Sequence, residues 1–298
     1  MEGSKGKMNV QVRRLVETRN ALGEGPLWDP VDRVIYWIDI LGRTVWRADA
    51  DGGNARHWSV PEHIGALALR RGGGAVVALR TGFHALDFET GTCTPITDPE
   101  AGNPRTRFND GKVDRRGRFF AGTMDYQQTE GLGSLYRLDP DLTCTKLDQD
   151  IVIFNAPCWS PDDTIFYFAD SAKGAIYAHD YDLETGTISN QRVFATADAA
   201  PGAPDGCTVD SEGYLWNARW GAGCVVRFAP DGRVDRMVEV PARKTTSCTF
   251  GGPDLDLLYV TSMKDPDNPE DPHDPEAGSI YVLTGLGVTG LPEPRFAG

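Results

Sequence analysis

The chain repeats one pattern of residues, and this repeat limits the folds that are open to it. In the two clearest copies, which begin at Glu24 and Asn155, the first residue is followed by Trp after four residues, Tyr after twelve and Asp after fifteen. Looser copies begin at positions 65, 109, 205 and 247, so successive starts are 41, 44, 46, 50 and 42 residues apart. Spacings of this size are typical of the blades of a β-propeller. The sequence therefore predicts an all-β, six-bladed β-propeller.

The segments between the repeat starts have the pattern of strands and turns. Short runs such as 25–29, 34–40 and 44–49 are separated by Asp-Pro and Asp-Gly turns, and no stretch of about a dozen residues has a helical apolar face. We expect residues 9–17 to form a strand that completes the last blade together with residues 279–284. Residues 8–298 are predicted to form a single domain, and residues 1–7, which precede a second methionine, are interpreted as a candidate expression tail.

Charge and composition argue against several classes of partner. The net charge is −13 and Lys and Arg form no cluster, so nucleic acid is not expected as a partner. No apolar run approaches the roughly 20 residues of a membrane span, and the N-terminus lacks the apolar core of a signal peptide, so we expect a cytoplasmic protein that binds no membrane. The six cysteines include no C-x-x-C pair and are expected to be reduced thiols.

The first residue of each repeat is the candidate functional position, because equivalent positions of the blades meet around the central channel. The second copy has Gly65 there, but four others carry a carboxylate or an amide: Glu24, Asn109, Asn155 and Asp205. Two carboxylates and two amides at one axis are suited to a hard cation and its substrate. Arg107 lies two residues before Asn109, on the same strand face, and is a second candidate for substrate binding.

Each of these residues also has an interpretation without function. Glu24, between two glycines, could be an exposed turn carboxylate, and Asn155 could cap neighbouring backbone groups. Asp205 lies in Pro-Asp-Gly, which is ordinary turn chemistry. Arg107 could form a surface salt bridge. The Asp110–Gly111 pair is interpreted as a turn rather than as part of the site.

Other motifs carry less weight. Residues 285–290 match G-x-G-x-x-G, but no helix follows, which excludes a dinucleotide site. The five histidines lack metal-ligand spacing; His63, near the second repeat start, is the one to check, with a surface role favoured. Residues 264–278 carry six acidic residues and four prolines and are expected to form a loop, either solvated or closing over the channel mouth.

Several motifs in a fixed order resemble those of the regucalcin (senescence marker protein) and gluconolactonase family. The resemblance extends from about residue 15 to the end of the chain and implies a six-bladed propeller with one divalent metal ion in its channel, which hydrolyses sugar-acid lactones. The motifs are residues 22–26 (LGEGP), 107–114 (RFNDGKVD), 120–124 (FAGTM), 204–206 (PDG), 244–248 (KTTSC), 250–252 (FGG) and 285–288 (GLGV).

The resemblance also implies roles for individual residues. The metal ligands of the family fall on Glu24, Asn155 and Asp205, the substrate contacts fall on Arg107 and Asn109, and Asp205 would also act as the acid and base. Two departures stand out. Residues 156–157 are Ala-Pro where many relatives have glycine, and the segment 125–132 is shorter than the lid of relatives, where Glu130 is the candidate to replace a substrate-contacting acid.

The leading hypothesis is a metal-dependent lactonase that opens an aldonolactone of a pentose or hexose, with Ca²⁺, Mg²⁺, Mn²⁺, Zn²⁺ or Fe²⁺ as the ion. The alternatives are an esterase or phosphotriesterase on the same scaffold and a calcium-binding regulatory protein. The expected partner is a small sugar lactone, and the chain is expected to be a monomer or a weak homo-oligomer.

Overall fold

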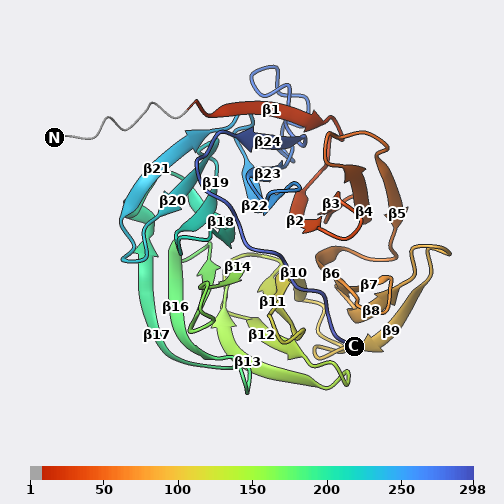
Figure 1. Cartoon of the computed structure of the whole chain (residues 1–298). Helices are drawn as coiled ribbons and strands as arrows, with labels where there is room; N and C mark the ends of the chain where they lie inside the picture. Colours follow the sequence, from red (N-terminus) through yellow and green to blue (C-terminus); the bar gives the residue numbers. More distant parts are fainter. Residues whose placement is uncertain (1–8) are drawn as a thin grey trace.

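The computed structural model describes residues 9–298, so the candidate expression tail at 1–7 lies outside the described residues. Within residues 9–298, 24 strands form six four-stranded antiparallel sheets that are arranged around one axis (Figure 1). Besides the strands, this part of the chain forms one short 3₁₀ turn at Ala197–Ala199. The prediction of an all-β, six-bladed propeller is confirmed.

Each of the first five blades is a meander whose strands run outward from the channel in chain order. Blade 1 contains β2 (Gly23–Asp29), β3 (Val34–Asp39), β4 (Thr44–Asp49) and β5 (Arg56–Ser59). Blade 2 contains β6 (Ile64–Leu69), β7 (Ala75–Leu79), β8 (Gly82–Leu86) and β9 (Cys93–Thr97). Blade 3 contains β10 (Thr106–Val113), β11 (Phe119–Asp125), β12 (Gly133–Leu138) and β13 (Cys144–Ile151). Blade 4 contains β14 (Phe154–Trp159), β15 (Ile165–Asp170), β16 (Ala175–Asp182) and β17 (Thr187–Thr196). Blade 5 contains β18 (Ala203–Val209), β19 (Leu215–Trp220), β20 (Cys224–Phe228) and β21 (Val234–Glu239).

Blade 6 joins the two ends of the described chain. It contains β22 (Thr245–Gly251), β23 (Leu257–Ser262), β24 (Ile280–Thr284) and, outermost, β1 (Gln11–Val16). β1 pairs antiparallel with β24, with Gln11 opposite Thr284. The prediction that residues 9–17 complete the last blade is confirmed, and this pairing closes the ring (Figure 1).

The core is distributed between the blades. Six apolar clusters of described residues lie one at each interface between neighbouring blades. At the interface of blades 6 and 1, for example, Trp28 stacks on Tyr259 with ring centroids 5.8 Å apart. The Trp and Tyr residues that recur in the sequence repeat therefore form interblade packing, because each sheet buries both faces against its neighbours.

The innermost strands share an irregularity that prepares the functional site. β2, β6, β10, β14, β18 and β22 each change register with the next strand, and every predicted repeat start lies at this change. A β-bulge breaks the alternation of side chains and redirects one of them. The repeated position is therefore the point at which each blade can turn a side chain toward the channel axis.

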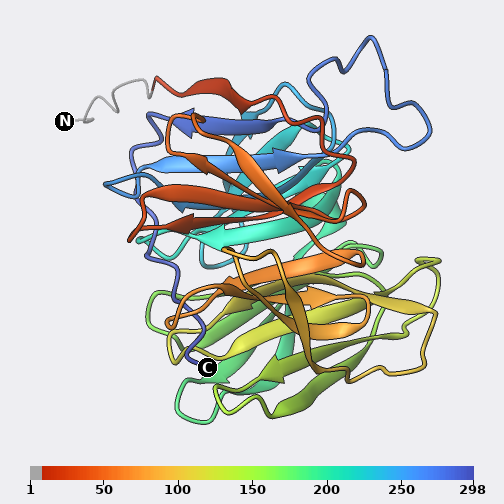
Figure 2. The same ribbon diagram turned by 90° about the vertical axis from the view of Figure 1, so that its right-hand side faces the viewer.

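The two ends of the channel differ. The innermost strands begin at one end, which we call the mouth; after β24 the chain crosses the opposite end, the base, as a strap formed by residues 285–298 (Figure 1). The strap forms bridges from Gly290 to Asp210 and from Phe296 to Arg70, and the Phe296 side chain is fully buried. Residues 264–278 form an irregular loop that projects on the side away from the C-terminus, so the prediction of a loop is confirmed (Figure 2). No helix within residues 9–298 is long and apolar enough to cross a membrane.

Candidate metal and substrate site

The four carboxylate and amide residues at the repeat starts are buried and lie near one another. Glu24, Asn109, Asn155 and Asp205 are between 4 and 8 % exposed. The Asn109 Nδ2 donates a hydrogen bond to Asn155 Oδ1 at 3.0 Å. The Glu24 carboxylate lies close enough to the Asp205 carboxylate for the repulsion between them to raise the pKa of Glu24. Side chains from blades 1, 3, 4 and 5 therefore meet at the axis, as expected from the repeat.

The structure excludes the interpretations without function for three of these residues. Glu24 is buried in β2 and is not an exposed turn residue. Asp205 lies in β18 rather than in a turn. Asn155 donates from Nδ2 to the Ser171 hydroxyl at 2.8 Å instead of capping the backbone.

The interpretation of residues 110 and 111 as a turn is wrong. Both lie inside β10, where Asp110 pairs with Gly122 and Gly111 with Ala121. The Asp110 carboxylate is buried and accepts hydrogen bonds from the backbone N–H groups of Gly111, at 2.7 Å, and Ala156, at 2.8 Å. Asp110 therefore joins the innermost strands of blades 3 and 4 beside the site.

The electrostatics of the group favour a bound cation. Glu24, Asp110 and Asp205 form no ion pair with any residue from 9 to 298. Burial raises the pKa of Glu24 well above its ordinary value, and repulsion from Asp205 and Asp110 raises it further. Burial likewise raises the pKa of Asp205, and it raises the pKa of Asp110 to about 6. Buried carboxylates without a counter-charge are costly, and a cation between them removes this cost.

The donor set at the site is made of oxygen atoms of mixed type. Over the described residues, no three His, Cys, Asp or Glu side chains come together in a group that could hold a metal ion. A cation at the Glu24 and Asp205 carboxylates would therefore need the amide oxygen of Asn155 as a third ligand. Carboxylate and amide oxygens together suit hard divalent cations, so the residues present fit the expected ion.

Carboxylates placed fifteen residues after the repeat start fix the backbone that precedes the site. Asp39 accepts hydrogen bonds from the N–H groups of Ala21 and Leu22, both at 2.9 Å, just before β2. Asp170 does the same for residues 152 and 153, before β14. The repeated Asp is thus a structural residue, since it sets the direction in which the innermost strand approaches the axis.

Two residues directly after the site residues adopt the left-handed conformation. Gly25 has φ +50°, and its N–H donates to Glu24 Oε2 at 2.7 Å. The equivalent residue after Asn155 is Ala156, which has φ +65°. A residue with a Cβ is strained in this region, and glycine is not. The departure noted in the sequence at position 156 is therefore a strained alanine where glycine would fit without cost.

Sequence reasoning missed two supporting residues. The Ser171 hydroxyl accepts from Asn155 and donates to Pro204 O at 2.6 Å, which ties Asn155 to the strand of Asp205. Asn217 Nδ2 donates to the backbone O of Asp205 at 2.6 Å. Asn217 lies twelve residues after Asp205, at the position where other repeats have Tyr. This replacement was a signal in the sequence, whereas Ser171 had none.

Arg107 is buried without an acidic partner. Its Nη1 donates to Asn109 Oδ1 at 2.8 Å and to Phe108 O at 2.9 Å, and Arg107 forms no ion pair within residues 9–298. Burial lowers its pKa to about 10, so the guanidinium stays charged at neutral pH. The interpretation of Arg107 as a surface salt bridge is thus excluded. Glu130 is not brought to this group, because it pairs with Arg105 on the surface at 2.8 Å.

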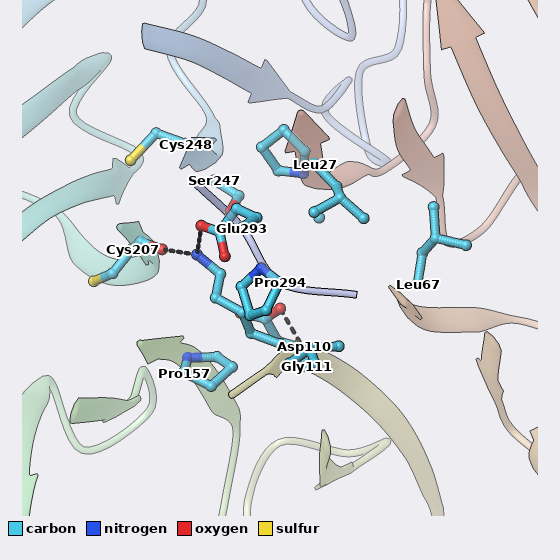
Figure 3. Close-up of a pocket in the computed structure, with 14 residues that line it drawn as sticks. Leu27, Leu67, Asp110, Gly111, Pro157, Cys207, Ser247, Cys248, Glu293 and Pro294 are labelled. Carbon is cyan, nitrogen blue, oxygen red and sulfur yellow. Dashed lines mark hydrogen bonds and ion pairs between the residues drawn. The ribbon is translucent and has the colours of Figure 1, made fainter. Parts of the chain in front are cut away.

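The channel continues below the site into a small cavity near the base. Lys112 enters it and donates from Nζ to Glu293 Oε1 at 3.0 Å and to Cys207 O at 3.3 Å (Figure 3). Glu293 and Pro294 of the strap line the cavity together with Asp110 and Ser247. The strap therefore covers the base side of the channel, and a ligand would approach the site from the mouth. All six cysteines are free, as expected.

Comparison with known proteins places this architecture in a family. Residues 22–264 match the model of the SMP-30/gluconolactonase/LRE-like region. Regucalcin from Gallus gallus is 39 % identical, with 97 % of this chain and 99 % of regucalcin covered. A regucalcin from Agrobacterium tumefaciens, described as a calcium-binding protein, is 34 % identical with a TM-score of 0.90, and covers 96 % of this chain and 97 % of its own. A luciferin-regenerating enzyme is 30 % identical with a TM-score of 0.91, with 97 % and 99 % covered. The chain therefore belongs to the SMP-30/gluconolactonase/LRE-like family.

Proposed function

We propose that the protein is a divalent-metal-dependent hydrolase that opens a sugar-acid lactone to the aldonic acid. The observation that carries the proposal is the pairing of opposite features at one buried place. Glu24, Asp205 and Asp110 are carboxylates without counter-charge, and Arg107 is a guanidinium without a counter-charge. A bound cation would neutralise the three carboxylates, and a ligand rich in oxygen atoms would accept hydrogen bonds from Arg107. Membership of a family named for gluconolactonase supports the lactone as that ligand.

The proposed metal ligands are Glu24, Asn155 and Asp205, each from a different blade. A Ca²⁺, Mg²⁺, Mn²⁺, Zn²⁺ or Fe²⁺ ion held by them would polarise the lactone carbonyl and lower the pKa of a bound water. Hydrogen bonds already orient the amide of Asn155, since Asn109 donates to its oxygen and Ser171 accepts from its nitrogen. The Asn155 oxygen keeps a second lone pair for the ion.

The proton transfers are assigned to Asp205. Hydrolysis requires a base that takes a proton from the attacking water and an acid that returns one to the ring oxygen as the C–O bond breaks. Asp205 is a carboxylate in the group and is the candidate for both steps. Arg107 stays protonated at neutral pH, so its role is to donate hydrogen bonds to substrate oxygens. Asn109 touches both Arg107 and Asn155 and keeps substrate and metal positions in register.

A second candidate is a calcium-binding protein in which the channel ion is structural. The description of the Agrobacterium relative as a calcium-binding protein favours this candidate. The two candidates share the metal ligands and differ in whether Asp205 and Arg107 act on a substrate.

The test is turnover of a panel of pentono- and hexonolactones, with each metal ion and with chelator. The lactonase proposal expects turnover that chelator abolishes and that Asp205→Asn lowers by at least about 10²-fold. Asp198→Asn is the matched control, because Asp198 is exposed in the 3₁₀ turn that precedes the blade of Asp205. Metal binding, followed by the rise in Tm, without turnover of any lactone would favour the calcium-binding candidate instead.

A further inference from the structure

His63 and Tyr126 form a pair beside Arg107 that the proposed mechanism does not use. His63 directly precedes β6 in blade 2, and Tyr126 directly follows β11 in blade 3. The His63 Nδ1 and the Tyr126 Oη are 2.9 Å apart and share a hydrogen bond. The guanidinium carbon of Arg107 lies 5.8 Å from the centre of the Tyr126 ring, within the range of a cation–π contact. The expected surface role of His63 therefore does not account for its contact with Tyr126 beside Arg107.

The pair is the outer end of a chain of contacts that starts at the proposed metal site. Asn155 Oδ1 accepts from Asn109, Asn109 accepts from Arg107, and Arg107 contacts the Tyr126 ring, which leads to His63. Each step leads away from the metal ligands. A ligand whose reacting carbonyl lies at Asp205 would therefore present its far side to the pair.

Tyr126 is held in place by its own backbone. Its N–H donates to Arg105 O at 2.9 Å. The next residues are fixed by the fully buried carboxylate of Asp125, which accepts from the N–H groups of residues 127, 129 and 130. The ring therefore projects from a rigid turn, which limits the entropy lost when it contacts a ligand.

His63 is fixed on its other side. The N–H of Arg80 donates to His63 O at 2.9 Å, and Arg80 forms an ion pair with Glu62 at 3.1 Å. Burial lowers the pKa of His63, and the nearby charges of Arg107 and Arg43 lower it further, so its ring is neutral at neutral pH. Burial raises the pKa of Tyr126, which is also neutral.

Packing alone does not explain the pair. Both side chains are only partly buried, and neither belongs to the six interblade clusters formed by the described residues. Among residues 9–298, the His63 Nε2 and the Nε and Nη2 of Arg107 have no hydrogen-bond partner. His63 and Tyr126, which are neutral and can both donate and accept hydrogen bonds, thus lie beside the Arg107 guanidinium, which has N–H donors without a partner. A hydroxyl group also donates and accepts, whereas a carboxylate only accepts and an ammonium only donates.

We propose that His63 and Tyr126 form a specificity subsite that binds a hydroxyl group on the part of the lactone remote from the reacting carbonyl. The inference rests on the proposed lactonase function and deepens it, because it assigns the selection of a polyhydroxylated substrate to blades 2 and 3. A site built around such a hydroxyl rejects the analogue that lacks it, since its own polar groups are then left without partners.

The test compares two six-membered lactones, D-glucono-1,5-lactone and δ-valerolactone, which has no hydroxyl groups. Tyr126→Phe and His63→Ala should each lower kcat/KM for gluconolactone by about 10- to 100-fold, mainly through KM, and should change kcat/KM for δ-valerolactone less than about threefold. His57→Ala is the matched control, because His57 also contacts an aromatic ring, Trp46 at 4.6 Å, but on the outer strand of blade 1. It should leave both values unchanged.

The outcomes separate this inference from the proposed function. Equal losses on both lactones, or losses no larger than those of His57→Ala, would overturn the subsite while leaving the lactonase intact. If the wild-type protein hydrolyses no lactone of the panel, the lactonase proposal fails, and a calorimetric titration with gluconate then tests the subsite by itself. Weaker gluconate binding by Tyr126→Phe than by the wild type would support the subsite, and equal Kd values would overturn it.

Discussion

Substitution of Gly65 by Ala tests how closely the blades approach one another at the channel. A Cβ at this position would lie 2.3 Å from the carbonyl C and O of Phe108 and 2.5 Å from the N of Asn109. Side-chain carbons do not approach other atoms within 3.0 Å, so β6 and β10 must separate by at least about 0.7 Å. The atoms met are backbone atoms, and no change of rotamer relieves the contact.

The magnitude follows from this geometry. Overpacking of a dense interior costs about 1–3 kcal/mol, and contacts with backbone place Gly65→Ala at the upper end, near 3 kcal/mol. For a domain of this size, that corresponds to a fall in Tm of about 5 °C. The strand that must move carries Arg107 and Asn109, so kcat/KM for a lactone should fall as well, by about tenfold or more.

Thermal unfolding and lactone turnover should be measured beside Gly72→Ala. Gly72 undergoes the same chemical change, but a Cβ there meets no atom within 4 Å. We expect this control to remain within about 0.5 kcal/mol of the wild type. A Gly65→Ala protein with the Tm of the Gly72→Ala protein would refute the close approach of blades 2 and 3, and with it the reason that this repeat start carries glycine.

Three further predictions concern stability. In the presence of chelator, the unfolding free energy should fall as the pH rises from about 4 to 7. The pKa of Asp110 is raised to about 6 in the folded protein, so the proton that Asp110 retains stabilises the folded state only below this pKa. Asp110→Asn should show a flatter dependence of the unfolding free energy on pH, measured by urea unfolding. Lys112→Met should cost about 1–3 kcal/mol by leaving Glu293, whose side chain is 12 % exposed, without its ion-pair partner, and Glu293→Leu in the same protein should recover most of it in a double-mutant cycle. Ala156→Val should lower the unfolding free energy by at least about 2 kcal/mol, because a β-branched residue is strongly disfavoured at φ +65°; unchanged urea midpoints would contradict it.

The sequence contains most of the fold because the repeat is set by packing that every blade needs. The aromatic residues at offsets four and twelve fill the interblade clusters, and the Asp at offset fifteen fixes the backbone before the innermost strand. These are local requirements that recur at a constant spacing, so they leave a periodic signal. The first residue of each repeat could also be predicted to lie near the axis, since it stands at the bulge of the innermost strand.

The remaining parts of the site depend on contacts between distant segments. Asp110 precedes glycine, as many turn residues do, and only its pairing with Gly122 and its hydrogen bond from Ala156 place it in the channel. Ser171 acts through Pro204 of the next blade. The strap belongs to no repeat, and its Glu293 forms an ion pair with Lys112, which lies 181 residues earlier in the sequence. Such pairs have no local spacing that a sequence pattern can detect.

The closure of the ring by β1 and β24 has a consequence for biosynthesis. Gln11 leaves the ribosome well before its partner Thr284 is made, because Thr284 follows it by 273 residues. At a translation rate of about 5–20 residues per second, β1 stays unpaired for roughly 15 to 55 seconds. During that interval the first five blades can assemble in order, while the gap that the pairing of β1 with β24 later closes has an unpaired strand edge on each side. A nascent chain of this kind therefore needs protection from other chains at one defined place, and a truncation at either terminus would keep that place open permanently.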